Sequence, residues 1–151
     1  MKSILTFLIL ISYISAYSQK SDVSGEVNFV SEMDGTITAR VIGYGSNIEK
    51  AKAEAELKAI EIILFRGLPE STQKTGLLEK GEFEAKHKNS TYFQNFYGKK
   101  GYKNFIMSSI PTSALIKNKG GQKSLGVDIK INVTALRIDL EQNQFIRKFG
   151  F

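Results

Sequence analysis

The residues that could bind a nucleotide are the glycines of the junction Gly43-Tyr44-Gly45, which follows a β-branched run and precedes an alanine-rich run. A dinucleotide-binding fingerprint needs a third glycine where this chain has Ile48, and the Gly-Lys-Ser/Thr end of a P-loop is missing. Free backbone amides at a helix start could still hold an anion. We expect instead a bend that lets a helix press close to a sheet, because glycine is the default residue for tight junctions.

Residue types needed for catalysis or metal binding are sparse. His87 is the single histidine, it lies in the charged stretch EAKHKN, and the chain has no cysteine. Zinc sites built from Cys and His therefore cannot form, and no Gly-x-Ser-x-Gly motif marks a serine nucleophile. We expect no catalytic residues, no cofactor and no metal site, and hence a protein that is not an enzyme.

The most unusual composition lies in the stretch 92–105, where aromatic residues and lysines are interleaved. One interpretation is a recognition surface in which exposed tyrosines are ringed by lysines. The candidate partner-binding residues are Tyr92, Tyr97, Lys99, Lys100, Tyr102 and Lys103. The alternative is that aromatic side chains in this stretch simply cover the core, as buried aromatics commonly do. Both interpretations hold if the tyrosines point outward while the phenylalanines, Phe93 and Phe96, point inward.

The scaffold that must position these side chains begins with a predicted hairpin. Two runs of β-type residues, 27–32 and 36–43, flank the dipeptide Asp34-Gly35. Asp-Gly between two such runs is a strong hairpin signal. We therefore expect two antiparallel strands that lead directly into the glycine junction.

A long helix is predicted next, capped by Ser46 or Asn47 and ending at Phe65 before Gly67. Its solvent-facing stripe is expected to be Lys50, Glu54, Lys58 and Glu61. One apolar face is flat and alanine-rich, with Ile48, Ala51, Ala55, Ala59 and Ile62. A second and bulkier face carries Ala53, Leu57, Ile60 and Leu64. Two apolar faces predict a helix clamped between the sheet and another helix or subunit.

The second half of the chain predicts an aromatic helix over 83–97, a hairpin turning at Gly120-Gly121, and a final helix capped by Thr134. A short ordered piece is expected around Leu77-Leu78. The residues from Val127 to Val133 alternate strictly between apolar and polar, as a half-buried strand does. The predicted fold is α+β: an antiparallel four-stranded sheet of two hairpins with helices packed on one face.

The N-terminus predicts export. A positive Lys2 precedes an apolar run of about 11 residues, too short for the roughly 20 that cross a bilayer, and small residues follow at Ala16 and Ser18. We expect a signal peptide at 1–18, a flexible segment at 19–25, and a single α+β domain at 26–151. Cleavage would leave no transmembrane segment. The cysteine that lipid anchoring needs is absent near the cleavage point.

The net charge of the chain limits the kinds of partner that it suits. The chain carries a formal net charge of +6. A basic exported protein suits an anionic lipid or polysaccharide surface or an acidic partner, although the charge could serve solubility alone. Nucleic acid is not an expected partner outside the cytoplasm.

The junction TARVIGYGSNIEKAKAEAELKAI resembles a pattern of bacterial envelope proteins: a strand, a Gly-x-Gly bend, a polar cap and a helix with Ala-x-x-x-Ala spacing. The FlgT-type N-terminal domain of flagellar accessory proteins and small envelope lipoproteins are examples. The segments FRGLP and ALRIDLEQNQFIRKFGF are similar to uncharacterised exported proteins of Bacteroidetes type. The resemblance implies an accessory or assembly role in the envelope, and it carries over no catalytic residue.

The function expected from the sequence is that of a non-enzymatic, exported envelope module, periplasmic or associated with the outer surface. It would act by binding another envelope protein, or itself as a homo-oligomer. The alternative is a small secreted binding or inhibitory protein that acts on a soluble partner or ligand.

We predict that the mature protein begins at Gln19, because Ala16 and Ser18 are the small residues that a signal peptidase selects. Mass spectrometry of the protein purified from its native host measures this directly. A retained Met1, or a first residue well beyond Lys20, would contradict the predicted signal peptide.

Overall fold

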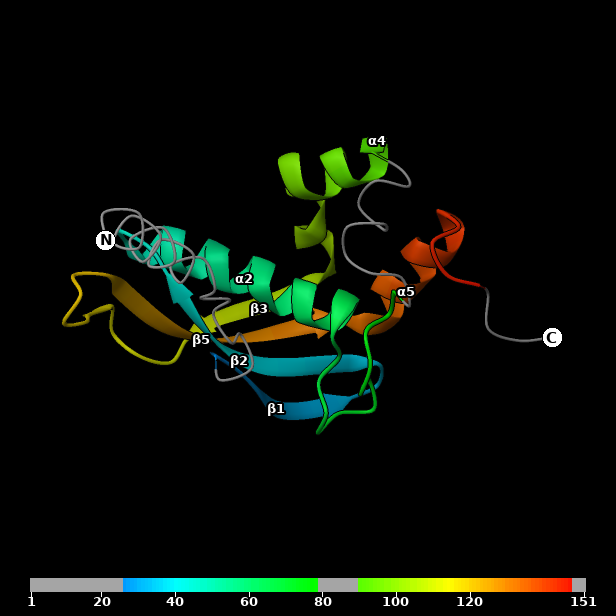
Figure 1. Ribbon diagram of the computed structural model, residues 1–151. Helices are drawn as coiled ribbons and strands as arrows, with labels where there is room; N and C mark the ends of the chain where they lie inside the picture. Colours follow the sequence, from blue (N-terminus) through cyan, green and yellow to red (C-terminus); the bar gives the residue numbers. More distant parts are fainter. Residues whose placement is uncertain (1–25, 79–89, 148–151) are drawn as a thin grey trace, which may run out of the picture.

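The computed structural model of the chain describes residues 26–78 and 90–147, and it shows one antiparallel sheet with helices on one face (Figure 1). The α+β class predicted from the sequence is confirmed. The predicted signal peptide at 1–18, the segment 19–25 and the first part of the predicted helix 83–97 lie outside the described residues.

The sheet has five strands in the order β1-β2-β5-β3, and β4 also pairs with β5. They are β1 (Val27–Met33), β2 (Thr36–Tyr44), β3 (Ile106–Pro111), β4 (Ile116–Lys117) and β5 (Lys123–Asn132). The sequence predicts four strands and misses β3, because a register shift at Met107 breaks its alternation and Pro111 ends it. The strand predicted to precede the Gly120-Gly121 turn is only the two residues of β4.

The hairpin of β1 and β2 forms as predicted. Asp34 and Gly35 both adopt positive φ, 50° and 73°, which matches the turn that Asp-Gly favours between strands. An extra residue at Val30 shifts the register of β1 between Phe29 and Ser31. Such a bulge bends an edge strand away from straight pairing.

Alternation along β5 gives the sheet an apolar face and a polar face. The residues buried against the helices are Leu125, Val127, Ile129 and Ile131 of β5 and Ile37, Ala39 and Val41 of β2. On the other face Arg40 lies opposite Asp128, and its guanidinium donates two hydrogen bonds of 2.7 and 2.8 Å to the carboxylate. A slip of one residue would invert both faces, so this pattern fixes the strand register.

Helix α2 (Ile48–Phe65) covers the apolar face of the sheet (Figure 1). Asn47 caps it as predicted, because its side chain accepts a hydrogen bond of 2.9 Å from the amide of Lys50. The predicted alanine-rich face is buried at Ala51, Ala55, Ala59 and Ile62, but the prediction is wrong at Ile48, which is 48% exposed at the first residue of the helix. A Cβ atom at Gly43 would lie 2.0 Å from the carbonyl oxygen of Ala51. The glycine junction is therefore a close helix–sheet contact.

The carbonyl groups at the end of α2 are capped by the segment that follows the helix. Gly67 adopts a φ of 80° and reverses the chain. The amides of Leu77 and Leu78 then donate to the carbonyl oxygens of Ile63 and Leu64, at 3.0 and 2.9 Å. This confirms the ordered piece predicted around Leu77-Leu78 and satisfies carbonyls that a helix end leaves unpaired.

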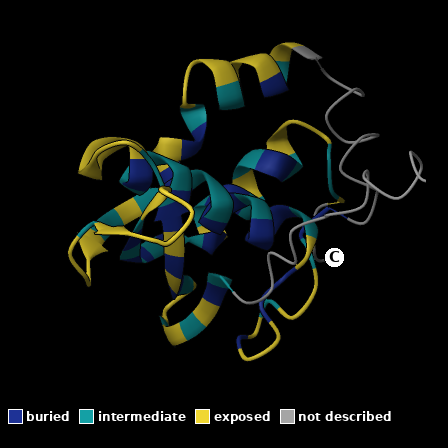
Figure 2. Cartoon of the chain, turned by 60° about the vertical axis from the view of Figure 1, so that its left-hand side comes forward, coloured by how far each residue is buried: buried dark blue, intermediate teal, exposed yellow. Residues whose placement is uncertain are grey.

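Helix α5 (Val133–Gln142) continues directly from β5. Its N-cap is Asn132, whose side chain accepts a hydrogen bond of 2.9 Å from Ala135. The prediction of Thr134 as the cap is wrong by two residues, because the asparagine at the strand end already fills that role. Leu136 and Leu140 are fully buried, and the helix ends at Gln142. Figure 2 shows buried residues lining the inner sides of the helices and sheet, with exposed residues outermost.

We predict that Gly43→Ala destabilises the protein by roughly 1–3 kcal/mol, the usual cost of overpacking a tight contact. The matched control is Gly98→Ala, because no heavy atom lies within 4 Å of a Cβ placed at Gly98. The control should change stability by less than about 0.5 kcal/mol. Urea denaturation followed by circular dichroism measures both, and equal shifts in the two variants would show that the helix does not press on the sheet at Gly43.

Candidate functional site

The aromatic stretch forms a corner that stands above α2, on the side away from the sheet (Figure 1). It consists of α4 (Ser90–Phe93), the π-helical turn η3 (Gln94–Gly98) and the 3-10 turn η4 (Gly101–Phe105). We call these three elements, together with α5, the aromatic corner. The helix predicted over 83–97 thus widens into a π-helix within its described part. Turns of π-helix are rare in proteins, and those that do occur are often found at functional sites.

The phenylalanines of the aromatic corner are packed inward, as predicted. Phe93 and Phe96 are buried and meet at 6.1 Å between ring centroids. Phe96 stacks on Phe105 at 6.1 Å, and Phe145 beyond α5 lies 5.1 Å from Phe93. Pairs at these separations add stability beyond their buried area. These rings continue the hydrophobic core into the aromatic corner and fix the corner in place.

The structure corrects the predicted surface at Tyr102 and Lys103. Tyr102 is only 4% exposed, so it belongs to the core and cannot reach solvent as predicted. Burial raises the pKa of its hydroxyl. Lys103 is turned toward α2, where its Nζ atom lies 2.9 Å from the Oε2 atom of Glu56. The reason is that Glu56 is a buried carboxylate, and a buried charge requires a partner.

The pair of Lys103 and Glu56 ties η4 to α2. The side chain of Glu56 is 7% exposed and that of Lys103 is 45% exposed, so the lysine covers the carboxylate from the solvent side. The hydrogen bond to Glu56 raises the pKa of Lys103, and burial opposes this shift only in part. Lys103 is thus an anchor of the corner and not part of a ring of free lysines.

The other four predicted residues lie at or near the surface. Lys99 and Lys100 are exposed at the turn between η3 and η4, where Lys100 adopts a φ of 57°. Tyr97 is half-buried and stacks on Phe93 at 5.9 Å. Tyr92 is also half-buried, and its hydroxyl donates a hydrogen bond of 2.6 Å to Asp139. Burial and this hydrogen bond raise the pKa of Tyr92 well above its ordinary value.

A pocket of about 400 Å³ opens between α4, η3, η4 and α5. Buried rings form part of its lining, and exposed amide side chains surround them. The lining residues are Thr91, Tyr92, Asn95, Phe96, Gly101, Asn104, Phe105, Asp139 and Asn143. Side-chain amides both donate and accept hydrogen bonds, so this lining can hold an uncharged polar group above an apolar base.

Sequence reasoning identified Tyr92 but missed Asn104, Asp139 and Asn143. The bond from Tyr92 to Asp139 joins residues 47 positions apart in the chain. One signal was present: Asp139 interrupts a helix whose neighbouring Leu136 and Leu140 face inward, so its position adjoins the core. The pocket itself depends on how α5 meets the aromatic corner, which no local pattern encodes.

The structure also corrects the predicted solvent stripe of α2 at Lys58. Its Nζ atom lies 2.6 Å from Glu26 and 3.0 Å from Glu54, and it lies above the ring of Tyr44, 4.9 Å from the ring centroid. The Tyr44 hydroxyl donates to Glu26, and this hydrogen bond, together with burial, raises the pKa of Tyr44 to about 12. Burial would raise the pKa of Glu26, but hydrogen bonds from Lys58 and Tyr44 and the charge of Lys58 lower it overall. The cluster is an anchor for the start of β1.

Metal binding and membrane spanning receive no support from the described part of the chain. Within residues 26–78 and 90–147, His, Asp and Glu side chains nowhere gather in a group of three that could hold a metal ion. None of the helices in these ranges has the length and apolar character needed to cross a bilayer. The single histidine, His87, lies outside the described residues.

Comparison of the chain with protein-family models, with curated protein sequences and with solved structures finds no match. The resemblance to the FlgT-type domain and to exported Bacteroidetes-type proteins therefore stays a prediction from short segments.

We predict that Lys103→Met destabilises the protein by about 1–3 kcal/mol, because it leaves the buried Glu56 carboxylate without its cation. Adding Glu56→Leu should restore most of the loss, since an apolar pair removes the buried charge. The pKa of Lys103 is raised in the folded state, so the contribution of the pair should be complete below pH 10.5 and should disappear as the pH rises further. Urea denaturation at neutral and alkaline pH measures these differences. A double variant less stable than Lys103→Met would refute the anchor.

Proposed function

We propose that this chain is a non-enzymatic module, exported to a cell envelope, that acts by binding another protein. The observation that carries the proposal is the pocket of the aromatic corner, where buried rings lie beneath exposed amides. Asn95, Asn104 and Asn143 can each pair with the N–H and C=O groups of a peptide. A partner segment could place an apolar side chain on the rings while these amides hold its backbone.

The rigidity of the corner supports a binding role. The stacked phenylalanines and the bond between Lys103 and Glu56 hold the walls of the pocket in one arrangement. A preformed site avoids the cost of ordering its walls when the partner binds. Recognition sites are commonly concave, largely apolar and preformed, with a few placed polar groups.

Charge at the rim favours an acidic partner segment. Lys99 and Lys100 are exposed beside the pocket, at the turn between η3 and η4. Such rim charges accelerate encounter and select against basic partners more than they add affinity. The predicted signal peptide supports an envelope location, and the periplasm or the outer surface would supply the partner.

A small secreted protein that acts on a soluble ligand is the second candidate. The size of the pocket favours it, because ligand sites commonly occupy about 300–1,000 Å³ and this one is about 400 Å³. In this reading the same amides would hold a polar small molecule.

We predict that a photoreactive residue placed at Lys99 forms a discrete cross-linked adduct with one envelope protein in the native host. Asn104→Trp should abolish most of this adduct, because the indole fills the pocket. Gln142→Trp is the matched control, since Gln142 is exposed on α5 but does not line the pocket. Immunoblotting detects the adduct and circular dichroism verifies folding.

Two results would oppose the proposal. An adduct that persists in Asn104→Trp would show that the partner does not use the pocket. If no adduct forms while the purified protein retains a small molecule displaced by Asn104→Trp, the soluble-ligand candidate would replace the proposed one.

A further inference from the structure

The segment 112–124, which contains β4, its turn and the first residues of β5 and is called the hairpin below, projects beyond the rest of the sheet at the left of Figure 1. Its turn is closed by a hydrogen bond of 2.8 Å from the amide of Asn118 to the carbonyl of Gln122. Gly121 adopts the positive φ of 83° that such a turn requires. A short, closed hairpin presents its tip in a fixed orientation.

The hairpin is basic without any acidic residue to balance it. The stretch from Ala85 to Val127 contains eight lysines and no aspartate or glutamate, and three of these lysines lie in the hairpin: Lys117, Lys119 and Lys123. Within residues 26–78 and 90–147, none of the three forms an ion pair.

Two of these lysines are placed at a cost to stability. Lys117 and Lys123 are direct partners in the β4–β5 ladder, and like charges opposite each other destabilise a sheet. The Nζ atom of Lys123 donates one hydrogen bond, of 3.2 Å, to the carbonyl of Ser46. An uncharged pair at these two positions would avoid the repulsion, whereas an anion outside the molecule would be held by both ammonium groups.

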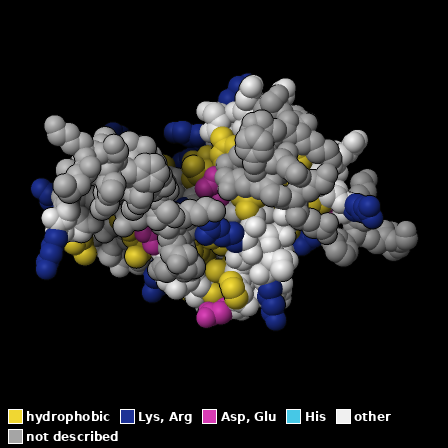
Figure 3. All heavy atoms as spheres, viewed as in Figure 1, with side chains coloured by type: hydrophobic (Ala, Val, Ile, Leu, Met, Phe, Trp, Pro, Cys, Tyr) yellow, Lys and Arg dark blue, Asp and Glu magenta, His cyan; other side chains and the backbone are white. Residues whose placement is uncertain are grey.

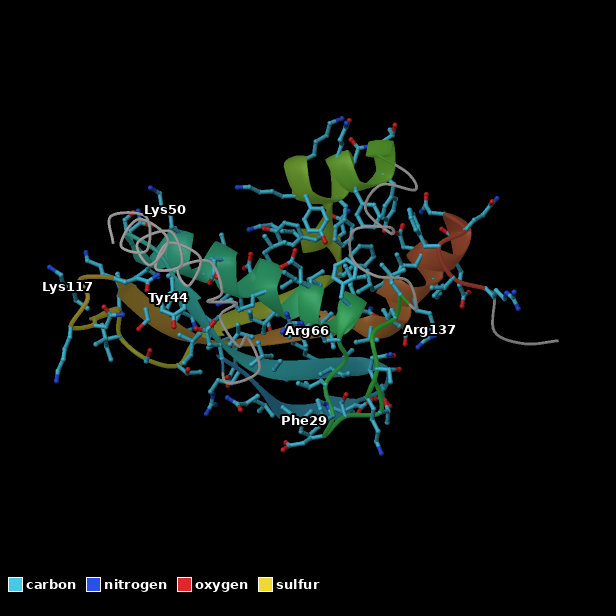
Figure 4. All side chains as sticks on the ribbon, viewed as in Figure 1. Phe29, Tyr44, Lys50, Arg66, Lys117 and Arg137 are labelled. Carbon is cyan, nitrogen blue, oxygen red and sulfur yellow. The ribbon has the colours of Figure 1, made fainter. Side chains whose placement is uncertain are left out.

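Apolar side chains are exposed beside the lysines. Ile116 of β4 is 59% exposed, and Ile48 at the start of α2 is 48% exposed. The bond from Lys123 to Ser46 holds the start of α2 against the base of the hairpin. Figure 4 shows Lys50 and Lys117 at this same end of the molecule, and Figure 3 shows basic and hydrophobic side chains together there.

We propose that this end of the molecule docks on an anionic phospholipid surface. Lys117, Lys119 and Lys123 would lie among the lipid phosphates, and Ile116 would enter the boundary of the acyl chains. Juxtaposed basic and apolar side chains are what binds a protein to such a surface without spanning it. This docking is independent of the pocket in the aromatic corner.

The geometry favours a lipid surface over another occupant. A two-residue strand and a turn offer much less than the roughly 1,000 Å² that a specific protein interface needs, whereas a fluid anionic surface needs no matching shape. A second copy of the chain would bring these lysines against lysines of the same kind, which like-charge repulsion opposes.

The test is flotation of the protein, purified in the form that its host accumulates, with phosphatidylcholine vesicles that contain or lack about one third phosphatidylglycerol. We expect binding only to the anionic vesicles. Substituting Lys117, Lys119 and Lys123 with Gln should weaken it by roughly 100-fold, because each lysine near an anionic surface contributes separately. The matched control removes the same charge at exposed lysines elsewhere: Lys74, Lys99 and Lys100. The affinity of that control variant for the anionic vesicles should fall by roughly tenfold at most.

Further measurements separate the contributions. Ile116→Ser should reduce the binding that survives in about 1 M salt, where the Debye length is only about 3 Å. Urea denaturation should show the hairpin variant to be about as stable as the wild type, because relief of the opposed lysines offsets the lost hydrogen bond from Lys123 to Ser46. Equal binding to both kinds of vesicle, or equal loss in the hairpin and control variants, would overturn the proposal. A change from dimer to monomer in the hairpin variant, without vesicle binding by the wild type, would assign the surface to a second copy instead.

Discussion

The separation between α2 and the sheet is set at Gly43, and the rest of the core depends on it. With the carbonyl oxygen of Ala51 only 2.0 Å from where a Cβ would stand, the helix backbone rests directly on the strand. Alanines keep this separation small near the start of the helix. Isoleucine and leucine fill the space toward its other end, at Ile60, Ile63 and Leu64. Packed interiors leave few voids. The space around this wider end of the helix must therefore be filled by side chains of the segments that follow it in the chain.

Helix α2 also holds two other parts of the molecule through charged side chains, although its composition is rich in alanine. Glu56 is buried although it is a carboxylate, and it holds the aromatic corner through Lys103. Lys58, two residues further on and therefore on a different side of the helix, holds the beginning of β1 through Glu26. The helix thus connects three parts of the molecule: apolar contact holds the sheet, and one ion pair holds each of the other two. A buried ion pair adds little to net stability but strongly disfavours arrangements in which it is broken.

Local patterns were sufficient for the elements with strict periodicity or clear punctuation. The Asp34-Gly35 turn, the Asn47 cap and the alternation of β5 each contain their whole signal within a few residues. The predictions that were wrong concern residues whose surroundings are set by partners far away in the sequence. Tyr102 and Lys103 have the composition of a surface, and only their contacts show that Tyr102 is buried in the core and that Lys103 is paired with Glu56. The pocket lies between elements that adjacent stretches of sequence do not join, so its residues could be recognised only in part.

The pairing of β2 with β5 has a consequence for how the chain becomes a protein. Arg40 and Asp128, which face each other at the centre of the sheet, are separated by 88 positions. Almost the whole chain must therefore emerge before the central ladder can close, and the entropy of closing so long a loop opposes early pairing. Until then only α2 can cover the N-terminal hairpin, and a two-stranded hairpin by itself is marginally stable at best. The central pairing of the sheet is therefore a late step, which is completed only after almost all of the chain has been synthesised.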